Sequence, residues 1–393
     1  MTPRQLKTGC FLLEGLNQFA CIYYFNYLLF HLRDRFGFGN LGNLTVAATC
    51  GFVYTFASWW CGRFAQRHGC FRALKIGFAG MTLVLVVGSF LDSVAGQYLT
   101  LIGWTVTVCF TWPALEALVS ENKAGDALPR MVGIYNVVWA ASAAAANFAG
   151  GALYEHFGAR SIFWLPAGMF AAQWLLTLWL STHAEANATN TPAAVAENPA
   201  PASEAPKHAP TFLRLAWLAN PFAYIAINTV TAIIPQLAHT LGLSPTQAGF
   251  FCSIWMFLRL GAFIFLWRWT GWHYRFGWLL AAFLALIGSF IALMVSHSFL
   301  WLMLGQTAFG LAIGLLYYSS LFYSMDAGDE KSAHGGMHEA AIGLGIFLGP
   351  ALGALSLWRF PAYPNGSAWA VSGLLVIGLG LLFKIRNGKT SRK

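Results

Sequence analysis

Twelve long apolar stretches constrain this chain more than any other feature of its sequence. They cover residues 9–32, 43–64, 73–92, 97–120, 131–153, 160–180, 212–238, 247–267, 276–296, 299–324, 335–357 and 367–385. Each is about 19–27 residues long, and a helix of that length crosses a hydrocarbon core of about 30 Å. Lipid offers the backbone no hydrogen-bond partners, so spanning segments of this kind must be helical. The sequence therefore predicts an all-α polytopic membrane protein with twelve transmembrane helices.

The charged residues support a membrane protein and indicate its orientation. Only 9% of the 393 residues are charged, whereas soluble domains contain about 25%. If the N-terminus is cytoplasmic, 18 of the 23 Lys and Arg residues fall on the cytoplasmic side, four fall outside and one lies within a span. This is the distribution that the positive-inside rule predicts. We expect a protein of the bacterial inner membrane with both termini in the cytoplasm. The net charge of +9 comes from basic residues scattered among apolar segments, which a membrane protein explains better than a nucleic-acid partner, so none is expected.

Residues 181–211 separate the stretches into two sets of six. This segment is rich in Ala, Pro, Asn and Glu and has almost no large apolar side chains, so it is predicted to be a flexible cytoplasmic linker. A shift of 203 residues also aligns Gly133 with Gly336 and Asn136 with Glu339. We expect two pseudo-symmetric six-helix bundles, residues 1–180 and 212–393, joined by the linker. Parallel repeats of this kind are typical of transporters.

The loop after the second stretch carries a family resemblance. It reads GRFAQRHGCFR over residues 62–72 and resembles the signature loop of the major facilitator superfamily, in which Gly, three residues, Asp, a basic residue, any residue and Gly precede further basic residues. Gly62, Arg67, Gly69 and Arg72 fit this pattern, whereas Gln66 replaces the usual Asp. The resemblance implies the superfamily's twelve-helix fold, a monomer, and a cytoplasmic gate at these five residues. Simple anchoring of the topology by the basic residues is an equal alternative.

Four charged residues lie inside the predicted spans: Glu14, Glu116, Arg259 and Glu339. Each costs about 2.5–3.5 kcal/mol in hydrocarbon on insertion scales, so they are expected to face a wet cavity or one another. Glu14, Glu339 and Glu116 are the candidate proton carriers, although Glu116 could instead reach the cytoplasm. Arg259 keeps its proton and needs a partner, either one of these carboxylates or an anionic substrate.

Helical spacing predicts which residues line that cavity. On one face of the first helix it aligns Glu14, Asn17, Cys21 and Tyr24, and on the fourth helix Thr105, Cys109, Trp112 and Glu116. The resemblance implies that the first, fourth, seventh and tenth helices surround the cavity. The candidate lining residues are Asn17, Tyr24, Trp112, Asn136, Trp139, Asn147, Asn228, Trp255, Arg259, Gln306 and Tyr317.

These features predict a secondary active transporter that moves a small organic solute by alternating access, coupled to protons. A proton-antiport efflux pump for drugs or metabolites is the alternative within the same class. A polytopic lipid-modifying enzyme is the alternative from another class, but the sequence has no Gly-rich phosphate loop and no HExxH motif, so no enzyme activity is expected. The expected partners are the solute, the proton and the lipid bilayer, and no cofactor or metal is predicted.

Overall fold

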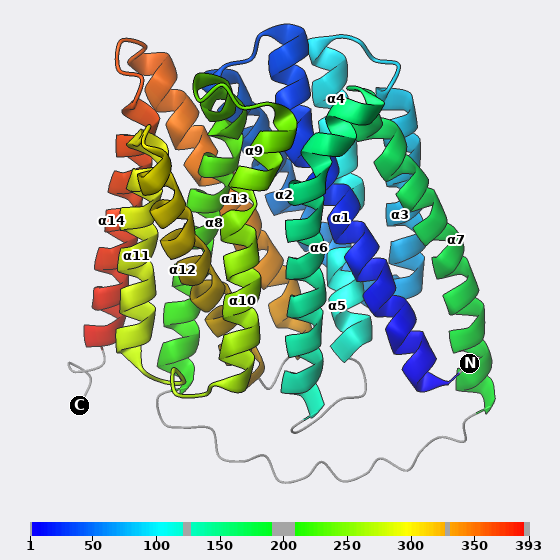
Figure 1. Cartoon of the computed structure of the whole chain (residues 1–393). Coiled ribbons are helices and arrows are strands. Elements are labelled where there is room, and N and C mark those ends of the chain that lie inside the picture. The colour runs from blue at the N-terminus through cyan, green and yellow to red at the C-terminus, as the bar shows by residue number, and fades with distance from the viewer. Residues whose placement is uncertain (1, 121–126, 191–208, 327–330, 389–393) are drawn as a thin grey trace.

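The computed structural model describes residues 2–120, 127–190, 209–326 and 331–388, which are almost entirely helical. The helical segments are α1 (Pro3–Phe36), α2 (Asn40–His68), α3 (Cys70–Gly88), α4 (Val94–Val108), α5 (Trp112–Ser120), α6 (Ala127–Phe157), α7 (Ser161–Asn190), α8 (Ala209–Thr240), α9 (Pro245–Cys252), α10 (Ile254–Arg268), α11 (Phe276–Val295), α12 (Phe299–Asp326), α13 (Lys331–Arg359) and α14 (Gly366–Asn387). They stand side by side in one bundle, and α1 begins at the same end at which α14 stops (Figure 1). We call this the terminal end of the bundle.

The number of helices agrees with the twelve expected. Within the described residues, eleven helices or helix pairs are long and apolar enough to cross a membrane. The twelfth is α1, which has 34 residues and lies among the others but carries polar residues such as Glu14, Asn17 and Gln18. The prediction of an all-α polytopic fold is confirmed.

Two of the expected helices are each divided into two segments. The fourth stretch forms α4 and α5, separated by a turn at residues 109–111. Pro113 has no N–H to donate to the carbonyl of Cys109, which explains a break at this point. The eighth stretch forms α9 and α10, which are separated by Ser253, whose hydroxyl donates a hydrogen bond to the carbonyl of Phe250 (2.9 Å).

The expected linker at residues 181–211 is shortened from both sides by helix. Helix α7 continues to Asn190, and α8 begins at Ala209. Residues 191–208 lie outside the described part of the chain, so the flexible linker and the division into two six-helix bundles remain predictions.

Glycine allows α13 to approach its neighbours with backbone against backbone. A Cβ atom added to Gly51 of α2 would lie 2.3 Å from the backbone nitrogen of Phe347 on α13. A Cβ atom added to Gly345 of α13 would lie 2.4 Å from the carbonyl oxygen of Pro221 on α8. Small residues at helix contacts permit such close packing in membranes. Helix α13 is therefore held directly against both α2 and α8.

The end of the bundle opposite the terminal end is closed where α6 meets α9. A Cβ atom at Gly151 of α6 would lie 2.0 Å from the carbonyl oxygen of Pro245, so no larger residue fits without separating the helices. Glu155 accepts a hydrogen bond from the backbone N–H of Thr246 (3.3 Å) and another from the hydroxyl of that residue. The carboxylate thus lies at the N-terminus of α9, where the helix dipole favours negative charge.

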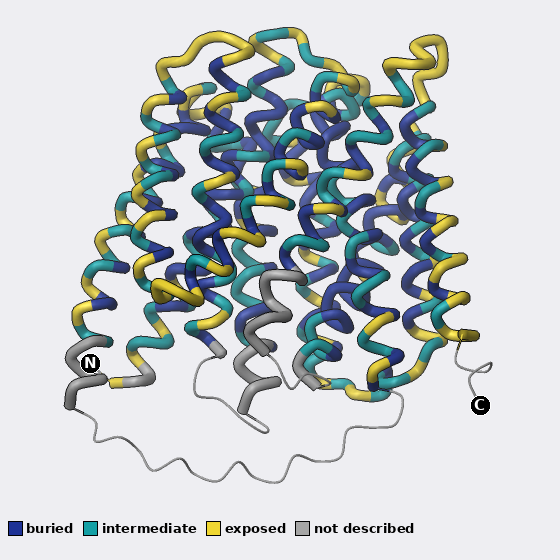
Figure 2. Tube along the Cα trace, turned by 180° about the vertical axis from the view of Figure 1, so that it is seen from behind, coloured by how far each residue is buried: buried dark blue, intermediate teal, exposed yellow. Residues whose placement is uncertain are grey.

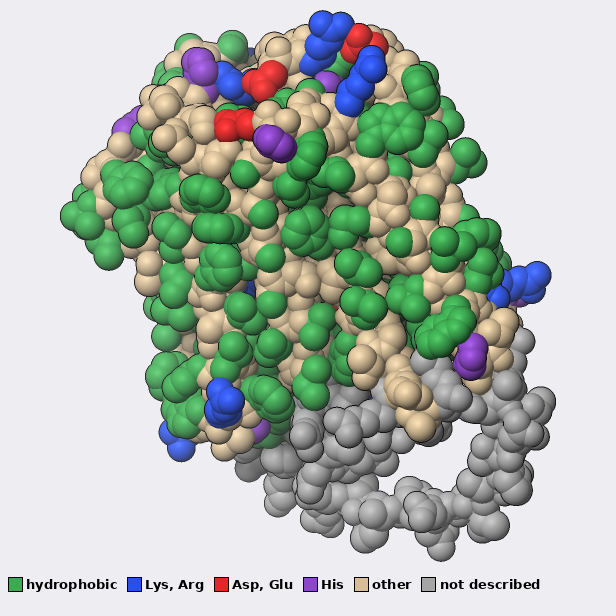
Figure 3. Space-filling view, turned by 45° about the vertical axis from the view of Figure 1, so that its right-hand side comes forward, with side chains coloured by type: hydrophobic (Ala, Val, Ile, Leu, Met, Phe, Trp, Pro, Cys, Tyr) green, Lys and Arg blue, Asp and Glu red, His purple; other side chains and the backbone are tan. Residues whose placement is uncertain are grey.

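The surface of the bundle is that of a membrane protein. Buried residues lie inside the bundle, and exposed residues face outward along the helices (Figure 2). The outward-facing residues of the middle belt are largely hydrophobic, whereas charged side chains gather toward the ends (Figure 3). Large exposed side chains such as Phe56, Leu83 and Leu99 are therefore suited to contact with lipid.

The predicted gate loop is a junction of a single residue. Helix α2 ends at His68, α3 begins at Cys70, and Gly69 between them has a φ of +91°. Glycine adopts this conformation without the steric cost of a side chain. Arg67 and Arg72 are exposed and form no ion pair with the residues described. Whether this loop acts as a latch or anchors the topology remains a prediction.

Candidate functional site

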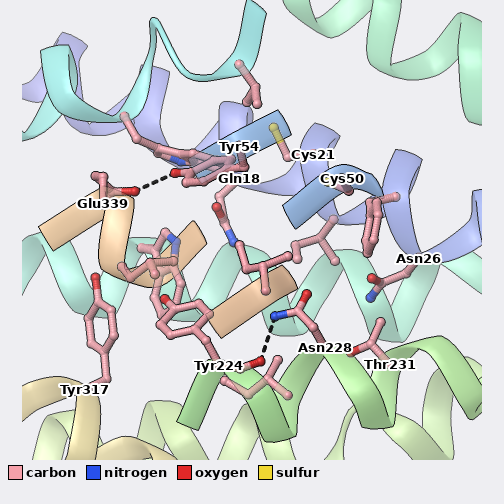
Figure 4. A pocket seen from close by; sticks show the side chains of 18 of the residues that line it. Gln18, Cys21, Asn26, Cys50, Tyr54, Tyr224, Asn228, Thr231, Tyr317 and Glu339 are labelled. Carbon is pink, nitrogen blue, oxygen red and sulfur yellow. Dashed lines mark hydrogen bonds between the residues drawn. The ribbon is translucent and has the colours of Figure 1, made fainter. Parts of the chain in front are cut away.

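A cavity of about 160 Å³ lies inside the bundle, where nine helical segments converge (Figure 4). Its walls come from α1, α2, α4, α5 and α6 and from α8, α10, α12 and α13. A bound water needs about 10–15 Å³ of such space, so the cavity has room for a small organic molecule. The lining is mainly apolar with a few polar groups, which is typical of small-molecule sites.

One polar group of the cavity is a hydrogen-bonded pair. The hydroxyl of Tyr54 on α2 donates to a carboxyl oxygen of Glu339 on α13 at 2.5 Å, and both residues are buried (Figure 4). The two residues are 285 positions apart in the chain. They meet because Gly51, one turn before Tyr54, lets α13 pack directly on α2. The pair therefore joins a helix from before the predicted linker to one from after it.

The other two glutamates lie near Glu339. The carboxyl groups of Glu14, Glu116 and Glu339 are close enough to interact electrostatically. Glu116 lines the cavity, whereas Glu14 on α1 lies behind the lining and is completely buried. Tyr135 of α6 lies next to Glu14. A charge inside a membrane-spanning bundle is costly, so three carboxyl groups in one region mark it as a candidate functional site.

Arg259 on α10 is the cation of this cavity. Its guanidinium carbon lies 4.4 Å from the ring centroid of Trp139 and 5.0 Å from that of Trp255. The Trp139 ring is also stacked on Tyr317, with 5.2 Å between the ring centroids and 8° between the planes. No carboxylate of a described residue lies within 4.0 Å of the guanidinium. Of the two partners considered for Arg259, a fixed ion pair with a glutamate is therefore not formed here.

Eight of the fourteen residues predicted for proton coupling and for the cavity line it: Trp112, Trp139, Asn228, Trp255, Arg259, Tyr317, Glu116 and Glu339. Six others are buried elsewhere: Glu14, Asn17, Tyr24, Asn136, Asn147 and Gln306. Their functional roles remain predictions, but the structure corrects the expected position of these six.

The correction on α1 is a rotation of the lining face by about one residue. The residues of α1 at the cavity are Gln18, Cys21, Ile22, Phe25 and Asn26. Asn17 instead donates a hydrogen bond to the hydroxyl of Thr111 (3.1 Å). Tyr24 packs on Trp104 of α4, with 4.8 Å between the ring centroids. The predicted stripe thus faces neighbouring helices, and it shares only Cys21 with the cavity.

Three more amide residues that were predicted to line the cavity lie elsewhere in the bundle: Asn147, Gln306 and Asn136. Asn147 accepts a hydrogen bond from Asn26 at its side chain (2.9 Å) and one from Tyr27 at its backbone (2.7 Å). Gln306 lines a second, much smaller cavity of about 20 Å³. Asn136 is buried without a hydrogen-bond partner among the described residues.

Sequence reasoning missed several polar residues of the cavity. Tyr54 was not expected because nothing in a sequence pairs α2 with α13, although its spacing of four from Cys50 is that of one helix face. Gln18 and Asn26 also line the cavity and share a helical face two turns apart. That spacing was a usable signal, but Asn17 offered an equally good alternative one residue away.

A bundle of membrane helices around an internal cavity with a few charged groups is the architecture of a transporter. The model of the Major Facilitator Superfamily matches residues 10–222 of the sequence. The chain belongs to this superfamily of membrane transporters and is an integral membrane protein. The resemblance stated from the loop at residues 62–72 is thereby confirmed.

Solved structures share the fold. The nucleoside transporter NupG matches with a TM-score of 0.68 and 15% identity, over 97% of this chain and 99% of NupG. The peptide transporter POT matches with 0.69 and 14%, over 98% and 94% of the two chains. The human organic anion transporter MFSD10 matches with 0.69 and 15%, over 97% and 100%. No curated protein sequence matches the chain. At these identities the likeness shows the fold alone.

Proposed function

We propose that this protein is a proton-coupled secondary transporter that moves a small organic solute by alternating access. The solute binds in the cavity, and the helices before and after residues 191–208 rock against each other around it. Both termini and the loop at residues 62–72 face the cytoplasm of a bacterial inner membrane, and the protein acts as a monomer.

The hydrogen bond between Tyr54 and Glu339 is the observation that carries the proposal. It links α2 to α13 across the cavity wall. If these helices separate when the cavity changes access, Glu339 loses the hydroxyl that stabilises its carboxylate. Proton binding at Glu339 would then depend on the conformation, and such dependence is what coupling requires. Glu14 and Glu116 are further candidate carriers because their carboxyl groups lie near Glu339.

A proton-flux assay in proteoliposomes tests this function. Pools of sugars, nucleosides, carboxylates and cationic drugs are added outside, and an enclosed pH-sensitive dye reports proton movement. The expected result is a solute-dependent proton signal in the wild type that is lost in Glu339→Gln or Glu14→Gln. Solute movement without proton flux in the wild type would contradict proton coupling. A proton signal opposite in direction to the solute would indicate antiport instead of symport.

A further inference from the structure

We propose that the transported solute is a small organic anion with a planar aromatic body, whose anionic group binds Arg259. This inference rests on the proposed transport function and names the substrate class of the same cavity. It is carried by the partners of Arg259, by the unpaired hydrogen-bond donors of the lining and by the flat side chains around them.

Arg259 is a permanent positive charge that the described protein does not neutralise. Its side chain is 4% exposed, and no described carboxylate lies within 4.0 Å. The faces of Trp139 and Trp255 stabilise the guanidinium in part, through the negative potential of the rings. A buried charge with no counter-ion is costly, and a guanidinium cannot reduce this cost by losing a proton. A bound anion would provide the missing partner.

The unpaired polar atoms of the lining favour the same type of ligand. Five buried polar atoms on the lining residues have no hydrogen-bond partner in the described structure: the Nε of Arg259, the Nε1 of Trp104, Trp112 and Trp255, and the Oε1 of Gln18. Four of these five are N–H donors. These atoms have almost no accessible surface, so they do not contact a ligand directly, but their unpaired N–H groups make the surroundings of the cavity rich in donors, which favours an acceptor ligand. An ammonium ligand offers only further donors.

The side chains around Arg259 favour a flat, apolar body. Trp139 and Tyr317 form a nearly parallel stack, and the ring of Phe263 lies 6.1 Å from that of Trp139. Trp112 and Tyr224 add further aromatic surface to the cavity wall. Aromatic rings gain from offset or edge-on contact with other rings. The volume of about 160 Å³ restricts the body to a small ring system.

The glutamates provide the argument for the rival class, an organic cation. Glu339 is already hydrogen-bonded to Tyr54, and Glu14 lies behind the lining. Glu116 does line the cavity, but its carboxyl group interacts electrostatically with those of Glu339 and Glu14. The guanidinium, by contrast, has no described carboxylate within 4.0 Å. This contrast favours the anion, and it assigns the carboxyl groups to proton transfer.

Binding of three probes that differ in charge tests the inference. Benzoate, benzamide and benzamidine share one aromatic ring and carry negative, zero and positive charge. Their dissociation constants are measured by titration calorimetry on the purified wild type, which needs no variant. We expect benzoate to bind at least about tenfold more tightly than either of the others, because a hydrogen-bonded ion pair is lost in both. Equal or tighter binding of benzamide or benzamidine, or no binding of any probe, would overturn the proposal.

Substitution of the cation locates the site. Arg259→Gln is expected to weaken benzoate binding at least about tenfold and to change benzamide binding by less than about threefold. Arg63→Gln is the matched control, because the exposed Arg63 also lies over an indole, that of Trp59, at 3.8 Å, but outside the cavity. Unchanged benzoate binding in Arg259→Gln would refute the assignment.

Proteoliposome uptake separates this inference from the proposed function. If benzoate binds as expected but no solute moves with protons, the coupled transport function fails and the ligand class stands. If only neutral or cationic solutes move with protons, the transport function stands and the ligand class fails.

Discussion

Glu339 and Arg259 line the same cavity, but their surroundings differ in kind. Glu339 accepts a hydrogen bond from Tyr54, a side chain on another helix, whereas Arg259 contacts the faces of Trp139 and Trp255. A carboxyl group can gain or lose a proton and can lose its partner when helices move. A guanidinium keeps its charge in every state. The environment of Glu339 is suited to a change of protonation, and that of Arg259 to holding a ligand. Substitution of Glu339 should therefore impair proton coupling, whereas substitution of Arg259 should impair ligand binding.

The largest effect is expected from Glu339→Gln. The amide cannot carry a proton, so accumulation driven by a pH gradient should fall at least about 100-fold, whereas exchange of labelled for unlabelled solute should stay within about threefold. Uptake and exchange are measured in proteoliposomes. Asp34→Asn, which removes a carboxylate outside the cavity, is the control and should affect neither. Equal loss of exchange and accumulation would contradict a role limited to proton transfer.

Tyr54→Phe should have an intermediate effect. It retains the carboxyl group but removes the hydrogen bond that a charged acceptor makes, which is worth about 1.5–3 kcal/mol. We expect uptake driven by the pH gradient to fall about tenfold. Raising the solute concentration should restore little of the lost uptake. An initial-rate series over solute concentration measures this. Wild-type rates would mean that the bond plays no part in coupling.

Trp139→Leu should affect the environment of Arg259, and its effect should be smaller than that of Tyr54→Phe. Loss of one aromatic wall of the cavity, worth about 0.5–1.5 kcal/mol in contact with the ring of the probe, predicts roughly fivefold weaker binding of benzoate. The number of protons moved per solute should not change. Calorimetry and the proton-flux assay measure the two quantities. Trp164→Leu, on the exposed surface of α7, is the control. A change in proton stoichiometry in Trp139→Leu would show that the two environments are not separate.

The exposed ion pair between Arg35 and Asp92 gives the smallest effect and a reference for the buried charges. Its atoms lie 2.6 Å apart, and the pair lowers the pKa of Asp92 below its usual 3.8. Because the pKa is lower in the folded state, the contribution is present above about pH 4 and is lost as the pH falls through the folded-state value. Arg35→Gln should lower the Tm by about 1 °C at pH 7. Thermal unfolding at pH 7 and pH 3 should show the difference shrinking at the lower pH.

The sequence predicted the fold well because membrane solvation acts on each helix separately. Every apolar stretch had the length of a span, and most of the observed helices cover the stretches expected. The same local rule identified Arg259 and Glu339, since a charge in hydrocarbon is conspicuous without any knowledge of its neighbours. The break at Pro113 is a further feature of the fold that the sequence carries locally, because proline lacks the N–H that would continue the helix.

The tertiary structure decided which faces meet. A rotation of α1 by one residue replaced Asn17 and Tyr24 with Gln18 and Asn26 in the cavity wall, because both faces carry similar side chains. Helix rotation depends on packing against neighbours, and hydrophobicity distinguishes these faces poorly in a membrane. The pairing of Tyr54 with Glu339 likewise depends on the close approach of α2 and α13, over 285 positions of chain. The sequence by itself determined the helices and their costly charges, whereas their partners followed only from packing in three dimensions.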